Sequence, residues 1–151
     1  MKLSPKGYEL IKKYEGFVSK PYLDAVGVPT IGYGNTYYPD GRKVTLQDNS
    51  INEQEATMLL GFIVSEFENG VDGLVNKPLK QCQFDALVSF AYNLGLGALK
   101  QSSLLSRVNN NPENAYIPNE FTRWVKAGGK ELKGLAKRRV EEANIYYNGN
   151  Y

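Results

Sequence analysis

The chain has 151 residues, 42% of them hydrophobic and 23% charged, with a formal net charge of +2. This is an ordinary composition for one globular domain, or for two small lobes around one core. It has no histidine and a single cysteine, Cys82, which excludes serine–histidine and cysteine–histidine catalysis, zinc ligation by histidine and an internal disulfide. A hydrolase of this composition has to transfer protons with carboxylates.

The first segment predicts a helix over about residues 5–15. Ser4 is a typical N-cap, and Pro5 suits the first helical position because its missing N–H is not needed there. Gly16 is a residue that commonly ends a helix. Glu15 is therefore expected in the last helical turn.

Residues 20–46 change character and predict a small antiparallel sheet. Gly, Pro, Val, Thr and Tyr dominate this segment. Two short strands are expected on either side of the turn 26–28, and a turn at residues 40–41 is expected to lead into a third short strand.

Helical periodicity dominates the rest of the chain. A long helix is expected to begin at a cap formed by Ser50 or Asn52 and to run to about residue 75. The most hydrophobic segment, 79–94, predicts a core helix. Shorter helices are expected at 102–110 and 117–126, followed by a break at Gly128-Gly129, a last helix over 134–147 and a frayed tail.

The charge is unevenly distributed. Residues 1–75 carry 7 basic and 10 acidic residues, a net charge of −3, and residues 76–151 carry 11 basic and 6 acidic residues, a net charge of +5. The segment 121–140 is especially basic. A basic surface favours an anionic partner such as nucleic acid, lipid head groups or acidic cell-wall polymer, and a solvated helix face is the alternative interpretation.

Glu15, Asp24 and Thr30 form the strongest candidate site. At a helix C-terminus the backbone carbonyls disfavour a charged carboxylate, as does burial beside aromatic residues, so Glu15 suits a general acid. Asp24 lies in a polar turn region and is expected to stay ionised. Two carboxyl groups in opposed environments are typical of glycosidases. If residues 28–34 form one strand, Thr30 lies on its small, open face with two glycines.

The residues around this site resemble a known family. In EGF…YLDAVGVPTIGYG, Asp24 follows Glu15 by nine residues and Thr30 follows by six more. This arrangement resembles the phage-type lysozymes, or endolysins, which are bacteriolytic muramidases of bacteriophages. QFDALVSFAYNLG (83–95) resembles the core helix of that family, and FTRWVKAGGKELKGLAKRRVEEA (121–143) resembles its closing segment, so the resemblance covers nearly the whole chain.

The resemblance implies an α+β, lysozyme-like fold in a single domain, 1–151. A small antiparallel sheet lobe is expected over about 16–52, and a larger helical lobe over 76–151 together with helix 5–15. A connecting helix is expected over about 53–75, with a saccharide cleft between the lobes. The implied reaction is hydrolysis of the β-1,4 bond between N-acetylmuramic acid and N-acetylglucosamine in peptidoglycan, which lyses the host cell.

The resemblance also implies roles for individual residues. Glu15 is expected to be the general acid, with Asp24 and Thr30 handling the water. Thr36 follows the predicted hairpin and is a candidate for contact with the sugar, and Tyr92 and Ser103 match family positions that line the substrate cleft. The alternative for Thr36 is a plain turn residue. For Tyr92 it is core packing, and for Ser103 it is the N-cap of helix 102–110. Arg138 and Arg139 either support the region of Glu15 or face solvent.

The expected partner is the peptidoglycan glycan strand, with no nucleic acid, cofactor or metal, no stable membrane insertion, and a monomeric chain. No signal peptide or membrane anchor is recognised, so accumulation in the host cytoplasm is expected until a holin-type protein permeabilises the membrane. Three rival functions remain: a lytic transglycosylase, a catalytically dead peptidoglycan-binding module, and a membrane-active protein that uses the basic segment 121–140.

Overall fold

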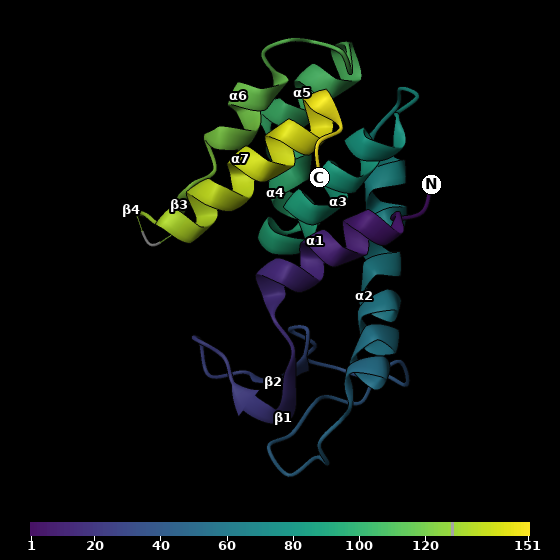
Figure 1. The fold of residues 1–151 in the computed structure, drawn as a ribbon, viewed down its shortest axis with the longest axis vertical. Helices are drawn as coiled ribbons and strands as arrows, with labels where there is room; N and C mark the ends of the chain where they lie inside the picture. The colour runs from purple at the N-terminus through teal and green to yellow at the C-terminus, as the bar shows by residue number, and fades with distance from the viewer. Residues whose placement is uncertain (128) are drawn as a thin grey trace. The chain divides into compact units, whose positions relative to one another are not determined.

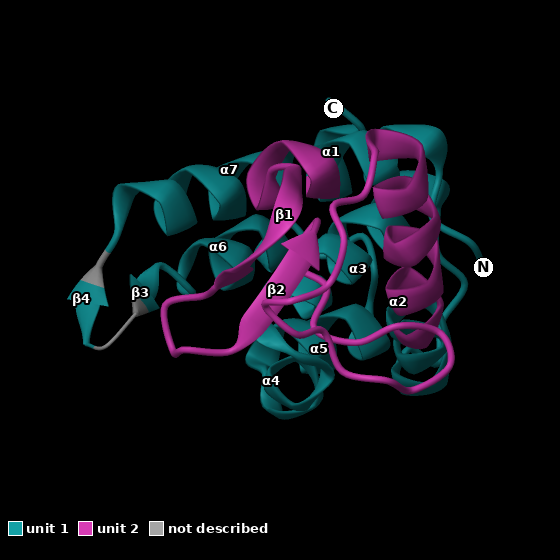
Figure 2. Ribbon diagram, turned by 90° about the horizontal axis from the view of Figure 1, so that it is seen from below, with its two compact units in different colours: residues 1–10, 67–151 teal, residues 11–66 magenta. Residues whose placement is uncertain are grey.

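A computed structural model of the chain describes residues 1–127 and 129–151, which are mostly helical (Figure 1). Two compact units are formed, one by Ile11–Glu66 and one by Met1–Leu10 together with Phe67–Tyr151 (Figure 2). The elements, in chain order, are α1 (Pro5–Glu15), β1 (Val18–Leu23), β2 (Pro29–Gly32), α2 (Glu53–Leu74), α3 (Gln81–Leu94), α4 (Leu96–Gln101), α5 (Ser103–Asn110), α6 (Ile117–Thr122), β3 (Lys126–Ala127), β4 (Lys130–Glu131) and α7 (Lys133–Asn148).

The ends of α1 follow from local signals. The Ser4 hydroxyl accepts a hydrogen bond from the Gly7 N–H at 3.1 Å, and Pro5 is the first helical residue. Gly16 has a φ of 72°, a left-handed conformation that glycine adopts without steric cost, and its N–H donates to the Lys12 carbonyl. The predicted helix and the position of Glu15 at its end are confirmed.

β1 and β2 form an antiparallel hairpin with a bulge. Tyr22 lies opposite Thr30, whereas Val18 lies opposite Gly32, so the register shifts between these two pairs. Pro21 falls inside the bulge, where its missing N–H leaves no ladder bond unmade. Such a bulge changes the direction in which the following side chains point.

The predicted third strand is wrong. Tyr37 and Lys43 form an isolated bridge around the expected turn, in which Gly41 has a φ of 87°. The pairing stops there because the chain turns again at once. The Asp48 N–H donates to the Thr45 carbonyl at 3.2 Å, so no extended segment follows.

α2 begins at a reciprocal cap formed by Asn52 and Glu55, so of the two predicted caps, Ser50 and Asn52, the second is confirmed. The Glu55 N–H donates to the Asn52 side chain at 2.8 Å, and the Asn52 N–H donates to the Glu55 carboxylate at 3.2 Å. Within the unit Ile11–Glu66, the buried apolar side chains are Ile11, Ile31, Tyr33, Val44, Ala56, Leu60, Ile63 and Val64.

In the other unit, α7 packs against α3 and α6. The Phe90 ring meets the Phe121 and Trp124 rings edge-on, with centroids 5.8 and 5.6 Å apart. The short helix α4 and the hairpin of β3 and β4 were not predicted, and α6 ends four residues earlier than expected. Gly129 has a φ of 79°, while Gly128, the other residue of the predicted break, lies outside the described residues.

Asp85 is fully buried and connects segments that are far apart in the sequence. Its carboxylate accepts hydrogen bonds from the Ser4 N–H at 3.1 Å and the Gln81 side-chain amide at 2.8 Å. The hydroxyls of Ser4 and Tyr151 donate to the same carboxylate. The chain after α7 is therefore anchored by Tyr151, and the expectation of a frayed tail is wrong.

A second buried cluster surrounds Glu142. Nε of Arg138 lies 3.2 Å and Nε of Arg139 lies 2.9 Å from its carboxylate oxygens, and the Ser89 hydroxyl donates to it. The side chains of Arg138, Arg139 and Glu142 are 4%, 0% and 0% exposed. The alternative in which the two arginines face solvent is therefore wrong, and neither adds to a basic surface.

Candidate active site

The three predicted catalytic residues all belong to the unit Ile11–Glu66. Glu15 is the last residue of α1 and is half-buried. Asp24 follows β1 directly and is also half-buried, while Thr30 lies in β2 and is 3% exposed. A helix end, a turn and a strand thus each position one of these side chains.

Val28 connects Asp24 to Thr30. Its carbonyl accepts the Asp24 N–H at 3.0 Å and the Thr30 hydroxyl at 2.8 Å, and its own N–H donates to Oδ1 of Asp24 at 2.9 Å. The Val26 N–H donates to the same oxygen, also at 2.9 Å. Both amide bonds reach Oδ1, so Oδ2 of Asp24 takes part in neither.

Glu15 lies against the turn that follows β2. A methyl group in place of the Gly34 hydrogen would lie 3.4 Å from Oε2 of Glu15, so the carboxyl group passes close to this glycine. Gly34 has a φ of 84°, within a tight turn where Ile31 and Asn35 exchange two backbone hydrogen bonds of 2.9 Å. β2 ends at Gly32, so the predicted strand over 28–34 is too long.

Tyr22 lies on β1, opposite Thr30 on β2. Burial raises the pKa of the Tyr22 hydroxyl above its ordinary value, and the carboxylates of Glu15 and Asp24 raise this pKa further. The sequence pattern placed Tyr22 on the strand before Asp24 but gave no reason to select it.

The weaker candidates lie in different environments. Thr36 is half-buried, and its carbonyl accepts the Val44 N–H at 2.9 Å. The Tyr92 ring is half-buried in the helical unit, with its centroid 5.2 Å from that of Phe67. Both rings are half-buried, and neither belongs to the buried core side chains.

Ser103 is exposed at the start of α5, and its hydroxyl accepts a hydrogen bond from Arg123 at 3.3 Å. The residue that caps this helix is Ser102, whose hydroxyl accepts the Leu105 N–H at 3.0 Å. The alternative role of Ser103 as the N-cap is therefore wrong. Neither contact tests whether Tyr92 and Ser103 bind substrate.

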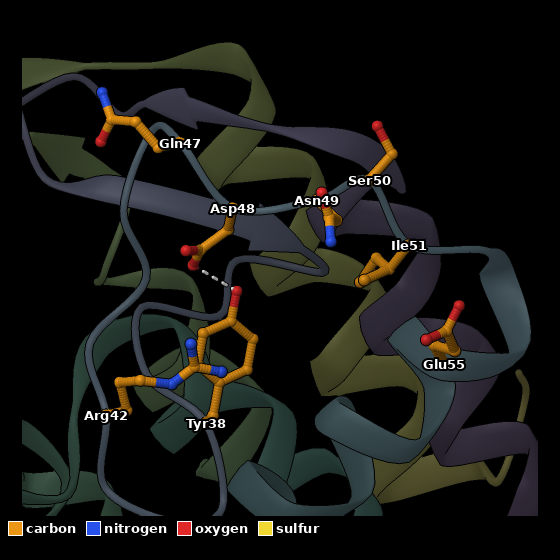
Figure 3. Close-up of a pocket in the computed structure, with 8 residues that line it drawn as sticks. All are labelled: Tyr38, Arg42, Gln47, Asp48, Asn49, Ser50, Ile51 and Glu55. Carbon is orange, nitrogen blue, oxygen red and sulfur yellow. Dashed lines mark hydrogen bonds between the residues drawn. The ribbon is translucent and has the colours of Figure 1, made fainter.

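A pocket of about 350 Å³ lies in the unit Ile11–Glu66, and its described lining includes none of the predicted site residues (Figure 3). Its wall is fixed by the Tyr38 hydroxyl, which donates to Asp48 at 2.6 Å (Figure 3). This bond, with two further bonds from Thr45, lowers the pKa of Asp48 to about 2. The Arg42 guanidinium lies 4.7 Å from the Tyr38 ring centre. These contacts hold the loop before α2 in place.

Comparison with known proteins identifies relatives over nearly the full chain. The phage lysozyme family model matches residues 12–142. The endolysin of Bacillus phage B103 is 45% identical over 99% of this chain and 55% of its own length. The endolysin of Salmonella phage P22 is 35% identical over 95% of this chain and 97% of its own. The chain spans about half the length of the Bacillus phage relatives that it matches.

Solved structures show the same fold. An endolysin from Escherichia coli O157:H7 phage FAHEc1 has a TM-score of 0.90 and 35% identity, covering 100% of this chain and 96% of that one. A mutant P22 lysozyme has a TM-score of 0.86 and 34% identity, covering 97% and 98%. The predicted resemblance and the lysozyme-like α+β fold are confirmed. The chain belongs to the phage lysozyme family.

Proposed function

We propose that this protein is an endolysin that hydrolyses the β-1,4 bond between N-acetylmuramic acid and N-acetylglucosamine in bacterial peptidoglycan. The observation that carries the proposal is the hydrogen-bonded link from Asp24 through Val28 to Thr30, in the same unit as Glu15. The endolysins among the relatives support this choice of substrate.

Glu15 is proposed to be the general acid. It stands at the C-terminal end of α1, where the partial negative charge of the backbone carbonyls favours a carboxyl group that keeps its proton. In the reaction this proton goes to the glycosidic oxygen while the bond from that oxygen to the sugar C1 breaks.

Asp24 and Thr30 are proposed to hold the attacking water. The Thr30 hydroxyl gives its hydrogen to the Val28 carbonyl, so its oxygen faces the water as an acceptor. Oδ2 of Asp24, which takes neither turn amide bond, accepts the proton that the water loses on adding to C1. Since the carboxylate activates a water and does not itself attack the sugar, we expect inversion at C1.

The second candidate function is a lytic transglycosylase, which uses an acid but closes the sugar on itself without water. The hydrogen-bonded link from Asp24 through Val28 to Thr30 favours hydrolysis, because a transglycosylase has no need to orient a water. A catalytically dead binding module is disfavoured because the acid and the water-holding pair are both present.

Mass spectrometry of products from purified sacculi, digested in ¹⁸O-labelled water, separates these functions. The hydrolase gives reducing ends that carry one ¹⁸O atom. A transglycosylase gives 1,6-anhydro ends without label, and a binding module releases nothing. The Glu15→Gln variant is the matched control for contaminating host enzymes. Unlabelled anhydro ends from the wild-type protein alone would contradict the proposal.

We also propose that the protein is made in the host cytoplasm and reaches the wall after a separate, holin-type protein permeabilises the membrane. A folded chain cannot cross a bilayer unaided, because its polar groups would have to enter hydrocarbon. Within the described residues no helix is both long and apolar enough to cross a membrane. Expressed alone in a Gram-negative host, the protein should permit growth until chloroform is added, whereas lysis without a membrane lesion would contradict this route.

A further inference from the structure

Asn35 is a buried polar residue to which the proposed reaction gives no role. It follows Gly34 in the tight turn after β2 and is 1% exposed. Its side-chain N–H donates to the Leu59 carbonyl of α2 at 3.1 Å. Its side-chain oxygen, Oδ1, is buried and has no hydrogen-bond partner among the described residues. Because an unpartnered buried oxygen lowers stability, the stability of the fold alone does not explain an amide at this position.

The turn that Asn35 closes lies against the proposed acid. Asn35 and Ile31 exchange two backbone hydrogen bonds of 2.9 Å, which fixes the backbone between them. Gly34 belongs to that stretch, and a methyl group added to it would lie 3.4 Å from Oε2 of Glu15. The position of this turn therefore sets how closely the backbone approaches the carboxyl group of Glu15.

Two contacts hold the turn on α2. Gly32 packs closely on this helix, since a methyl group added to it would lie 3.4 Å from Cβ of Ala56. Leu59, which accepts the bond from Asn35, lies in the next turn of the helix. A carbonyl oxygen has two lone pairs, so Leu59 can accept this bond in addition to its helical one. Packing of a glycine resists only closer approach, whereas the hydrogen bond also fixes direction.

We propose that Asn35 is a positioning residue: by binding the Leu59 carbonyl it holds the turn of Gly34 against Glu15, so that the acid keeps its place for proton transfer. The inference rests on the proposed role of Glu15 as the general acid. Proton transfer needs the acid within hydrogen-bond reach of the glycosidic oxygen, and a displacement of about 1 Å can lower a rate about 10²-fold. Asn35 acts on the reaction only through this turn.

The test is Asn35→Leu, which nearly keeps the size of the side chain but removes the donor and the unpartnered oxygen. We expect kcat on purified sacculi to fall about tenfold with KM nearly unchanged, because substrate still binds while the acid is displaced. The melting temperature should change little, because the Leu59 carbonyl keeps its helical partner. If the leucine variant does not fold, Asn35→Ala, which cannot overfill the site, should show the same fall. A wild-type kcat in the folded variant would overturn the proposal.

Asn109→Leu is the matched control. The Asn109 side-chain N–H also donates to a carbonyl of α2, that of Leu74, at 3.0 Å, but in the other unit. Its side-chain oxygen accepts the Asn76 N–H at 2.8 Å. The substitution should lower the melting temperature and leave kcat as in the wild type. An equal fall of kcat in both variants would overturn the proposal, because it would show a general effect of losing such a bond.

A double variant tests whether Asn35 acts through the turn. Gly34→Ala disturbs the same contact with Glu15 directly. If Asn35 holds that contact, the two substitutions are not independent, and the double variant should lose about as much kcat as the more impaired single variant. Losses that multiply would overturn the proposal, because Asn35 would then act by another route.

Amide hydrogen exchange separates this inference from the proposed function, since it requires no cleavage of glycan. Exchange of the Ile31 and Asn35 amides, which pair across the turn, should be about tenfold faster in Asn35→Leu and unchanged in Asn109→Leu. Unchanged exchange in Asn35→Leu would overturn the inference, even with full activity in the wild type. An active Glu15→Gln variant would instead overturn the acid assignment.

Discussion

The two units hold their carboxylates in different ways. In Ile11–Glu66, Asp24 accepts backbone N–H groups from residues two and four positions ahead, and Asp48 is bound by Thr45, three positions earlier. In the unit of Met1–Leu10 and Phe67–Tyr151, Asp85 and Glu142 also have partners 81 and 53 residues away, Ser4 and Ser89, beside local ones such as Gln81 and Arg138. Asp24 and Asp48 stay half-exposed, whereas the two carboxylates that also bind distant segments are fully buried.

The largest expected effect tests whether the half-exposed carboxylates do the chemistry. Glu15→Gln keeps the size of the side chain but removes the acid, so the hydrolysis rate should fall by about 10²- to 10⁴-fold. The melting temperature should change little. The rate is measured as release of reducing ends from sacculi. A folded variant that keeps the wild-type rate would contradict the assignment.

The buried carboxylates should show the opposite pattern. Glu142→Gln leaves two buried guanidinium groups without their counter-charge, so we expect a loss of about 3–5 kcal/mol in the free energy of unfolding. Urea denaturation measures this loss. The control is Glu113→Gln, because the Glu113 side chain is 57% exposed in its ion pair with Lys80 and should contribute at most about 1 kcal/mol. Equal losses in the two variants would mean that burial does not decide how much a carboxylate contributes to stability.

Gly34→Ala sharpens the comparison by acting on the geometry of the acid. The new methyl group would lie 3.4 Å from Oε2 of Glu15, in a backbone conformation that disfavours alanine. A small displacement of the acid should lower kcat by about tenfold. Gly41→Ala is the matched control, since its φ of 87° carries the same backbone strain with no heavy atom within 4 Å of the added methyl. If both variants lose the same activity, strain and not the contact with Glu15 is responsible.

The smallest effect concerns pH. The pKa of Asp48 in the folded protein is about 2, below its ordinary value, so its contribution to stability is complete above about pH 4 and is lost as the pH falls through about 2. Asp48→Asn should therefore have a lower melting temperature than the wild type at pH 5, and the difference should shrink toward pH 2. Calorimetry at pH 5, 3 and 2 measures it. If the difference in melting temperature does not depend on pH, Asp48 stabilises the loop through its shape and not through its charge.

The local features of the fold could be read from the sequence. Ser4, Pro5 and Gly16 specify the ends of α1 through their own backbone and side-chain preferences, and Asn52 does the same for α2. The spacing of Glu15, Asp24 and Thr30 indicated the family for a related reason. Val28 joins Asp24 to Thr30 within seven residues of chain, so one short segment carries their arrangement.

The remaining features depend on partners that the sequence pattern does not name. Nothing near Asp85 in the chain points to Ser4 or Tyr151, and the basic spacing around Arg138 and Arg139 fits a solvated helix face as well as a buried one. The third strand was predicted from turn and strand residues alone, but Thr45 and Asp48 turn the chain before it can extend. The pairing of Tyr22 with Thr30 depends on the register of β1, which the bulge changes.

The contacts of Asp85 have a consequence for the order in which the protein folds during synthesis. Its carboxylate binds Ser4, which leaves the ribosome early, and Tyr151, which leaves it last among these residues. The helical unit is assembled from two separate stretches, whereas Ile11–Glu66 is continuous. The segment that carries Glu15, Asp24 and Thr30 is therefore complete in the nascent chain well before the helical unit can close around Asp85.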